Sequence, residues 1–366
     1  MGIEVEGAAE RSILQRRPAR VHWKSFEQAK IIDNGVNPND IHQGGIGDCY
    51  LLAAISSVAV FPGYVEKMLC HGQRNDSGQY CVRWYCNNGK GQRDTWVTPS
   101  FVVNDGNDSF FHAHSENANE IWVNIIEKAY AQEYGGYDKI GNGGNIAKAL
   151  ADITGADVET TKVKYYTNQM NWQRITNGCE NASKVSSSGR GHIMCAGITW
   201  SPFVRYATFG VDRLFMRFVY PCLTMIGLTA YVWPCWLFII YGLYMVYSFI
   251  DAKLTCGTLN AFVNTLPSQY IVGLVSGHAY SVIGFKSHKV CGIFELKLVK
   301  VRNPWGNGVE WKGRWGDRSW MWLLFPALKA EINAAPAEDG SFWMGYNDFL
   351  MYFDTVDTCS VDIQSA

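Results

Sequence analysis

The sequence predicts an α+β fold, with helical segments in the first half of the chain and strand-like segments in both halves. Apolar residues recur at helical spacing directly after Cys49, and again in an amphipathic stretch at 118–134. Later in the chain, 279–285 and 293–301 are short apolar segments rich in β-branched and aromatic residues, as is typical of strands. Between these regions, five glycines fall within residues 135–144, and this cluster predicts a hinge.

The hinge divides the predicted fold into a first part, residues 22–143, and a second part, residues 144–360. Strand-like segments at 80–86 and 95–103 belong to the first part. A further helix at 145–154 opens the second part. With 366 residues, the chain is long enough for both parts to enclose a substantial core.

The composition is that of a folded, soluble, intracellular protein. Apolar residues make up 48% and charged residues 18%, and the net charge of −1 gives no sign of a nucleic-acid partner. Residues 1–21 are polar and predicted to be disordered, without the apolar core of a secretory signal. The 11 cysteines show no repeated spacing, which predicts neither a disulfide framework nor a structural zinc site. Reduced thiols indicate a cytoplasmic location.

Cys49 has the local sequence of a nucleophile. It ends the segment QGGIGDC, residues 43–49, and is predicted to begin a helix, whose N-terminal N–H groups and dipole stabilise a thiolate. The glycines before it are expected to let the backbone turn sharply. The backbone N–H of Cys49 and the side-chain amide of Gln43 could together bind an oxyanion. Taken alone, a cysteine here is more often a small buried apolar residue.

A base and an orienting group lie far along the chain. His278 stands in GLVSGHAYSVIGF and Asn303 in VRNPWGNGVEW. An amide oxygen accepting from histidine Nδ1 would fix the ring so that Nε2 faces the thiol, and Trp305 could shield that bond. The alternatives are a structural histidine in a strand and a tight turn with a packed aromatic side chain.

This chain resembles papain-like cysteine proteases in the order of its candidate residues, which is Gln43, Cys49, His278, Asn303. The local sequences of the segments that carry them resemble those of the calpains. Two more segments resemble calpain sequences, ENANEIWVNIIEKAYAQEYGGY and DGSFWMGYNDFL. The resemblance therefore covers about residues 22–202 and 258–360. It implies a papain-like core of two lobes, a helical one carrying the nucleophile and an antiparallel-sheet one carrying the base. It also implies an intracellular endopeptidase that makes limited cuts in protein substrates.

The resemblance further implies calcium regulation, with one ion in each lobe. Two carboxylates match ligands in the first lobe and three match ligands in the second: Asp40 and Glu120, then Glu310, Asp317 and Asp339. Where the family usually has a second-lobe glutamate, this chain has Ser341, so weaker binding is expected there. Tyr50 replaces the family's usual tryptophan after the nucleophile.

The largest departure is a hydrophobic insert at about 203–257. Residues 218–250 include no Asp, Glu, Lys or Arg. A single membrane crossing would place two strands of one lobe on opposite sides of the membrane, so it is incompatible with the fold. Two interpretations of the insert remain. It could contact the membrane as a re-entrant hairpin, or it could be translated intron sequence that is absent from the mature protein. The insert also favours a different function, that of a catalytically silent, membrane-linked scaffold or binding module. The sequence leaves the oligomeric state open.

Overall fold

The computed structural model describes residues 21–61, 63–86, 91–163, 172, 190–199, 272–290 and 294–362. The chain forms two compact units, one of residues 1–197 with 278–366 and one of residues 198–277. The predicted disordered segment 1–21, apart from its last residue, and the insert 203–257 lie outside the described residues. Within the described ranges, none of the helices combines the length and hydropathy that crossing a bilayer requires.

The predicted helices form in the first unit. The helix after the nucleophile candidate is α2 (Cys49–Val58), and the amphipathic stretch forms α4 (Trp122–Glu133). The third is α6 (Ile146–Thr154), whose first turn is capped by the side chain of Asn145. Four shorter helical segments complete this region: η1 (Pro38–Asp40), α3 (Tyr64–Met68), η2 (Cys70–Gly72) and α5 (Tyr137–Ile140).

Three small antiparallel pairs accompany these helices. They are β1 (Val21–Ser25) with β5 (Ser100–Asn104), β2 (Ile41–His42) with β6 (His114–Ser115), and β3 (Tyr80–Cys86) with β4 (Gly91–Val97). The prediction of one strand over 95–103 is wrong, because β4 ends at Val97 and β5 begins at Ser100. Pro99 stands between them and cannot donate to a strand ladder.

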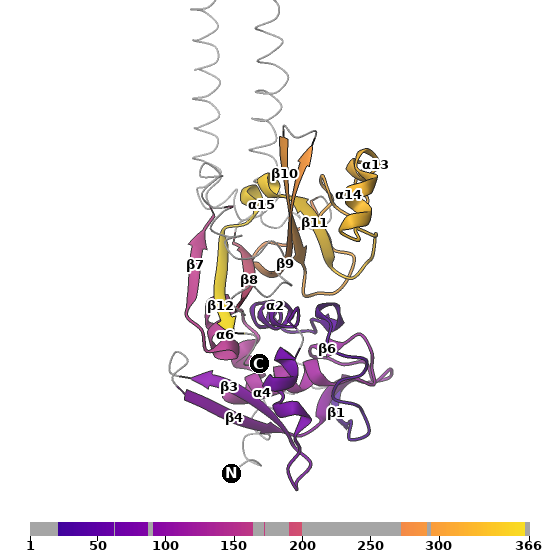
Figure 1. The fold of residues 1–366 in the computed structure, drawn as a ribbon. Coiled ribbons are helices and arrows are strands. Elements are labelled where there is room, and N and C mark those ends of the chain that lie inside the picture. The colour runs from indigo at the N-terminus through magenta and orange to yellow at the C-terminus, as the bar shows by residue number, and fades with distance from the viewer. Residues whose placement is uncertain are drawn as a thin grey trace, which may run out of the picture. The chain divides into compact units, whose positions relative to one another are not determined.

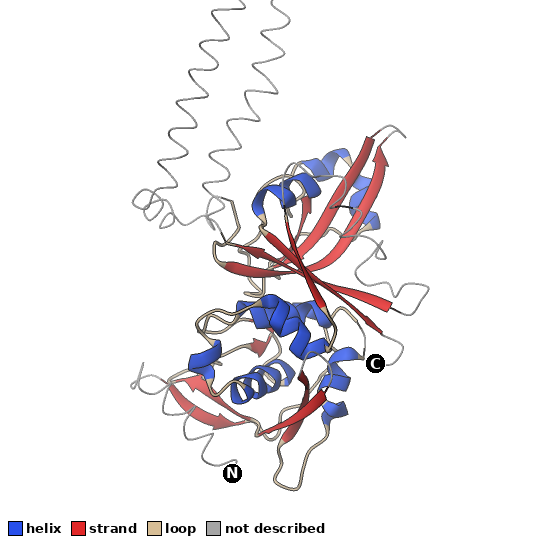
Figure 2. Ribbon diagram, turned by 90° about the vertical axis from the view of Figure 1, so that its left-hand side faces the viewer, coloured by secondary structure: helices blue, strands red, loops and turns tan. Residues whose placement is uncertain are grey.

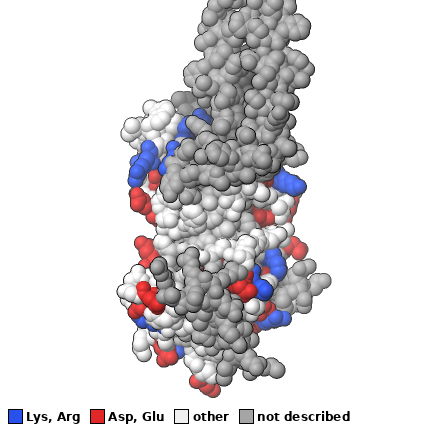
Figure 3. Space-filling model, turned by 180° about the vertical axis from the view of Figure 1, so that it is seen from behind, with Lys and Arg blue, Asp and Glu red and all other residues white. Residues whose placement is uncertain are grey.

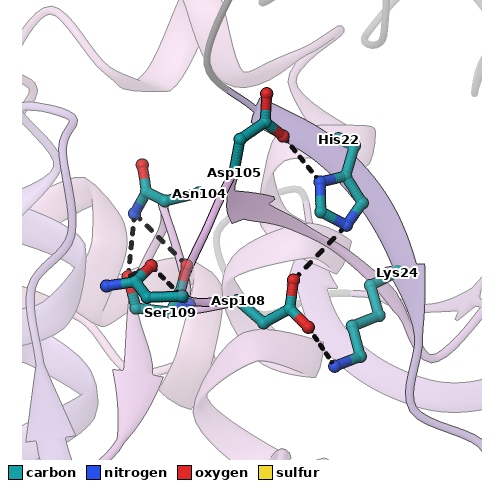
Figure 4. Close-up of polar contacts among 7 residues, drawn as sticks. His22, Lys24, Asn104, Asp105, Asp108 and Ser109 are labelled. Atoms are coloured by element: carbon teal, nitrogen blue, oxygen red, sulfur yellow. Dashed lines mark hydrogen bonds and ion pairs between the residues drawn. The ribbon is translucent and has the colours of Figure 1, made fainter.

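Ion pairs fix the turn that follows β5 against β1. His22 Nδ1 lies 2.7 Å from Asp105 and Lys24 Nζ lies 2.8 Å from Asp108, as Figure 4 shows. All four side chains are about half exposed. Pairs of this kind contribute at most about 1 kcal/mol each, so their role is local.

A six-stranded sheet dominates the rest of the unit. Its order is β11 (Ser341–Gly345), β10 (Phe294–Arg302), β9 (His278–Val290), β8 (Arg190–Ile198), β12 (Thr355–Asp362) and β7 (Val158–Lys162). The pairs β11–β10, β10–β9, β8–β12 and β12–β7 are antiparallel. The structure therefore confirms a mixed fold of helices and antiparallel sheets. Strand β9 extends the predicted 279–285 at both ends, and β10 matches the predicted 293–301 to within one residue at each end.

Helix α2 is buried along almost its whole length, which matches its mostly apolar sequence. It packs against β9 and α6, and both ribbon views show it between the six-stranded sheet and α4 (Figures 1 and 2). Two hydroxyls fix it to the sheet: Ser57 donates to the Met194 carbonyl at 2.7 Å, and Ser281 donates to the Ala53 carbonyl at 2.9 Å. The residue that begins α2 is thereby held close to the start of β9.

A smaller core lies beneath α13 (Met321–Leu324) and α14 (Pro326–Glu331). Trp315, Trp322 and Leu328 pack there with Leu298 of β10 and Trp343 of β11. The last helix, α15 (Tyr346–Tyr352), contacts β10 and β11. On the face drawn in Figure 3, basic and acidic side chains are interspersed over the described part of the surface.

Candidate active site

Cys49 is the first residue of α2, as predicted. The carbonyl of Asp48 accepts from the amides of Leu51 and Leu52, at 2.9 and 3.2 Å, and closes the first helical turn. The thiol is largely buried and accepts a hydrogen bond from the backbone amide of Ala279, in β9. Burial raises the pKa of Cys49. The Ala279 amide lowers it and the nearby Asp48 carboxyl raises it.

The glycines before Cys49 serve a different purpose from the predicted one. None of Gly44, Gly45 and Gly47 has a positive φ. Instead, Gly44 packs so closely that an added Cβ would lie 2.3 Å from the backbone carbonyl carbon of His112. The amide of Gly47 donates to the Gly141 carbonyl at 2.9 Å. These glycines let neighbouring backbone approach the nucleophile segment, and they do not supply a left-handed turn.

His278 and Asn303 form a hydrogen bond, but through Nε2 of the imidazole and not through the predicted Nδ1. His278 Nε2 lies 2.8 Å from Asn303 Oδ1, so the prediction of an Nδ1 bond is wrong. The reason is geometric, because β9 presents the ring with Nε2 toward the end of β10. This arrangement leaves Nδ1 as the nitrogen that can serve the thiol. Although both side chains are described, no hydrogen bond joins His278 to Cys49 within the described structure.

Asn303 is itself firmly held. It is fully buried, its amide donates to the Val309 carbonyl at 3.0 Å, and its Oδ1 also accepts from the Trp305 amide at 3.1 Å. The Trp305 ring centroid lies 5.1 Å from that of His278. Trp305 therefore packs against the imidazole beside this hydrogen bond, where the sequence predicted a shield.

A β-bulge influences which face of the sheet the side chains of His278 and Asn303 occupy. Between β9 and β10 the register changes from Lys300↔Gly284 to Val301↔Val282. An extra residue in one strand reverses which face the following side chains occupy. Because the bulge lies between the sheet's middle and the ends that carry His278 and Asn303, it determines that these two side chains meet.

Both candidate reacting groups are uncharged at rest. Burial lowers the pKa of His278 to about 4, although the hydrogen bond to Asn303 opposes the shift. The Cys49 thiol, with its raised pKa, keeps its proton at neutral pH. A thiol and a neutral imidazole are the reactants for proton transfer from sulfur to nitrogen.

Gln43 lies on the nucleophile side of the same site. Its amide donates to the Ile46 carbonyl at 2.8 Å, and its backbone N–H donates to the Pro304 carbonyl at 2.9 Å, next to Asn303. An amide nitrogen carries two hydrogens, so the bond to Ile46 engages one of them. The backbone bond fixes the segment before Cys49 to the segment after β10.

Asp40 and Glu120, the first pair of carboxylates, are near each other. Glu120 accepts from the Asp33 amide at 2.7 Å, and Asp40 accepts from the Asn37 amide at 2.9 Å. Burial raises the pKa of both groups, and the charge of Asp40 adds to the rise at Glu120. A buried and a half-buried carboxylate that repel each other suit a hard cation such as calcium.

Glu310, Asp317 and Asp339 also gather. Burial raises the pKa of Glu310 to about 7, and the charges of Asp317 and Asp339 add to this rise. Asp339 accepts from the backbone N–H of Ser341 at 2.8 Å and from the side-chain amide of Asn39 at 2.7 Å. The donor chemistry fits calcium, although these oxygens do not all lie within 4.8 Å of one another.

Three buried ionisable side chains, Asp48, Glu127 and Arg302, were not predicted from the sequence. Asp48 and Glu127 are fully buried carboxyls that interact with each other. Burial raises the pKa of both, to about 6 for Asp48. Arg302 is fully buried and donates to the carbonyls of Asn39 and Ile41, at 3.0 and 2.7 Å. The available signal was position, since Asp48 directly precedes Cys49 and Arg302 directly precedes Asn303.

Comparison with known proteins gives one consistent result. The sequence profile of the family described as "Calpain family cysteine protease" matches residues 7–229 and 239–360. The chain is 26% identical over 364 residues to Calpain clp-4 of Caenorhabditis elegans, covering 96% of this chain and 40% of that protein. It is 27% identical over 355 residues to Calpain-12 of Mus musculus, with coverages of 93% and 37%. It is also 27% identical over 342 residues to the calpain-type cysteine protease DEK1 of Zea mays, with coverages of 91% and 12%.

Proposed function

This chain belongs to the calpain family of cysteine proteases, and we propose that it is an endopeptidase acting through Cys49, His278 and Asn303. The chain spans 40% or less of the length of the relatives described above. The single observation that carries the proposal is the 2.8 Å pairing of His278 with Asn303 at the start of β9, where the next residue's amide bonds to the Cys49 thiol. A structural cysteine would have no need of an oriented imidazole on the residue that directly precedes the one whose amide it contacts.

In the proposed reaction, His278 Nδ1 takes the proton of Cys49, and the thiolate attacks the carbonyl carbon of a peptide bond. The developing oxyanion is bound by the Cys49 backbone N–H, at the free N-terminus of α2, and by the Gln43 amide. The imidazolium then donates its proton to the leaving amine. Water releases the acyl group, with His278 again acting as base. Asn303 holds the ring throughout these steps through Nε2.

We further propose a papain-like core of two lobes, residues 22–143 and 144–360, which makes limited cuts in intracellular protein substrates. Support comes from the antiparallel sheet that presents His278 and Asn303, and from the mainly helical region that presents Cys49. The absence of a Cys49–His278 hydrogen bond, noted above for the described residues, is compatible with a resting enzyme whose two halves must still close.

Calcium is the regulator that the carboxylate groups would suit. Asp40 and Glu120 would hold one ion, and Glu310, Asp317 and Asp339 a second. When bound, a divalent cation supplies positive charge that offsets repulsion within each group. Asp40 is close in sequence to Gln43, and Asp339 is joined through Gly340 to Asn303, so both groups are connected to the proposed catalytic residues.

A peptidyl inhibitor that alkylates thiols tests the function directly. With calcium present, the full chain should cleave an unstructured protein substrate and become labelled at Cys49. Cys49→Ser should abolish both results, whereas Cys359→Ser, which changes a buried thiol, should leave them intact. A folded protein that neither cleaves nor becomes labelled under these conditions would favour the silent scaffold.

A further inference from the structure

Three side chains distant from the proposed chemistry come together as a set of metal-binding groups. Cys70 Sγ, Cys81 Sγ and a carboxylate oxygen of Asp94 all lie within 4.8 Å of one another. Within the described residues, this is the only group of three or more His, Cys, Asp or Glu side chains that meets this distance. None of the three residues has a role in the proposed peptidase reaction.

The tertiary fold brings these residues together from η2, β3 and β4. In the β3–β4 ladder, Cys81 pairs with Trp96 and Arg83 pairs with Asp94. Side chains two apart on a strand share a face, so Cys81, Arg83 and Asp94 project from the same side of this hairpin. The Cys81 amide donates to the Gln73 carbonyl at 3.2 Å, which fixes the start of β3 to the end of η2.

The backbone at Cys70 is held in an uncommon conformation. Cys70 and His71 have φ values of 49° and 55°, two consecutive non-glycine residues in the left-handed region. Such conformations are costly for L-residues and persist only where the surroundings enforce them. Here the left-handed turn carries the Cys70 thiol, whose side chain hydrogen-bonds with that of Cys81. Strained residues of this kind cluster at active sites, ligand-binding sites and switch regions.

Asp94 is oriented by a neighbouring guanidinium. Arg83 donates to both of its carboxylate oxygens, Nε to Oδ1 and Nη2 to Oδ2, each at 2.8 Å. Each oxygen has a further lone pair that could bind a metal. Arginine beside a metal-binding carboxylate fixes the orientation of that ligand and compensates its charge.

We propose that Cys70, Cys81 and Asp94 form a binding site for a soft divalent cation of the zinc class, with water in the fourth tetrahedral position. Binding releases the two thiol protons to solvent, so the ligands become two thiolates and one carboxylate. Their three negative charges are balanced by the divalent cation and the guanidinium of Arg83, which gives a neutral site. Paired thiolates select zinc-class metals over calcium, which prefers oxygen ligands alone.

Sequence spacing conceals this site. Cys70 and Cys81 are separated by ten residues, and Asp94 follows after twelve more, so no short CxxC pattern appears. This spacing explains why a structural zinc site was not expected from the cysteine pattern. Only the pairing of β3 with β4, and the contact of β3 with η2, create the cluster.

Cobalt(II) titration of the full chain, after treatment with a chelator and a reductant, tests the proposal. Thiolate–Co²⁺ bonds give a charge-transfer band in the near ultraviolet, and tetrahedral Co²⁺ sites give intense bands in the visible range. Both sets of bands should appear at one equivalent and should disappear when Zn²⁺ is added. Cys70→Ser should remove most of the charge-transfer band, whereas Cys49→Ser, which changes the other partly exposed thiol in the described chain, should leave it unchanged.

Asp94→Asn provides a second variant that keeps both thiols, and it should weaken Co²⁺ binding at least about tenfold, since even groups outside the ligand set contribute 10–100-fold. Bands that survive Cys70→Ser would overturn the proposal, as would bands lost with Cys49→Ser. A Cys70–Cys81 disulfide in the isolated protein, with no cobalt bands after its reduction, would overturn it as well. Because the cobalt spectrum is independent of peptidase activity, a failure here is distinguishable from a failure of the proposed function.

Discussion

The backbone amide of Asn303 donates a 2.8 Å hydrogen bond to the carbonyl of Gly340, and the amide of Gly340 donates to Glu310 at 2.8 Å. One glycine thus connects the residue that holds His278 to a carboxylate of the second acidic group. Gly340 has a φ of +82°, and an added Cβ would lie 2.5 Å from the Asn303 carbonyl oxygen. The acidic group and Asn303 are therefore joined through a single residue.

Gly340→Ala should lower both the stability and the activity of the protein. The left-handed backbone alone costs about 1 kcal/mol for a non-glycine residue, and the collision with Asn303 adds to it. Gly106→Ala is the matched control, because Gly106 has a φ of +95° and open space around it. Urea denaturation should show the larger loss for Gly340→Ala, accompanied by a fall in kcat. Equal losses in both variants would mean that the close contact with Asn303 has no consequence.

Asn303→Ala should lower kcat while leaving KM nearly unchanged. The imidazole would lose the partner of Nε2, and an oriented base is worth about 10²–10⁴ in rate. Asn307→Ala is the control, because Asn307 is exposed and its side chain only accepts from the Val309 amide nearby. Steady-state kinetics on a peptide substrate would separate the two parameters. Wild-type kcat in Asn303→Ala would exclude the orienting role.

Gly44→Ala should be far more harmful than Gly45→Ala. At Gly44 a methyl group would meet the backbone of His112 at 2.3–2.5 Å, whereas at Gly45 it would approach the Phe111 side chain at 3.2 Å. Backbone cannot move aside as a side chain can, and overpacking commonly costs about 1–3 kcal/mol or more. Thermal denaturation of the two variants measures the difference. Similar melting temperatures would show that the segment before Cys49 relaxes freely.

Asp48 gives a prediction about pH. Burial raises its pKa to about 6 from 3.8, so the folded protein keeps a proton that the unfolded chain releases earlier. Stability from this group is therefore present below about pH 4 and is lost as the pH rises to about 6. Relative to Asp48→Asn, the wild-type protein should lose unfolding free energy across this range. His278 titrates in both proteins and cancels in the comparison.

Urea denaturation at a series of pH values measures this difference. The exposed Asp76 provides the control variant, Asp76→Asn, whose stability should follow that of the wild type at each pH. A constant difference between wild type and Asp48→Asn from about pH 4 to about pH 7 would contradict the buried titration.

Calcium titration should reveal two unequal sites. Ser341 contributes a hydroxyl where a charged ligand is usual in the family, and it donates to Asn39 at 3.1 Å. Since the number of charged ligands strongly tunes calcium affinity, the second site should be the weaker. In isothermal titration, Glu120→Gln should remove the tighter event and Glu310→Gln the weaker one. Glu338→Gln, which changes an exposed carboxylate near the second group, should preserve both. Two equally tight sites would refute the assignment.

The elements that could be predicted are those whose signal is local. Apolar residues recur at helical spacing after Cys49 and again in 118–134, so periodicity located α2 and α4. Segments 80–86, 279–285 and 293–301 were predicted as strands for the same reason. The break between β4 and β5 was missed, although Pro99 marks it, because the apolar pattern continues across the proline.

The sequence by itself determined which residues could form the candidate site, since Cys49, His278 and Asn303 each stand in a distinctive local segment whose order matches the family. Only the tertiary structure decided how they meet. It pairs Nε2 of His278 with Asn303, and the close packing of Gly44 on His112 explains a glycine that the sequence attributed to a turn. The same is true of Cys70, Cys81 and Asp94. Helical and strand periods depend on neighbours along the chain, whereas the choice of ring nitrogen, a backbone contact or a cluster of ligands depends on segments far apart in sequence.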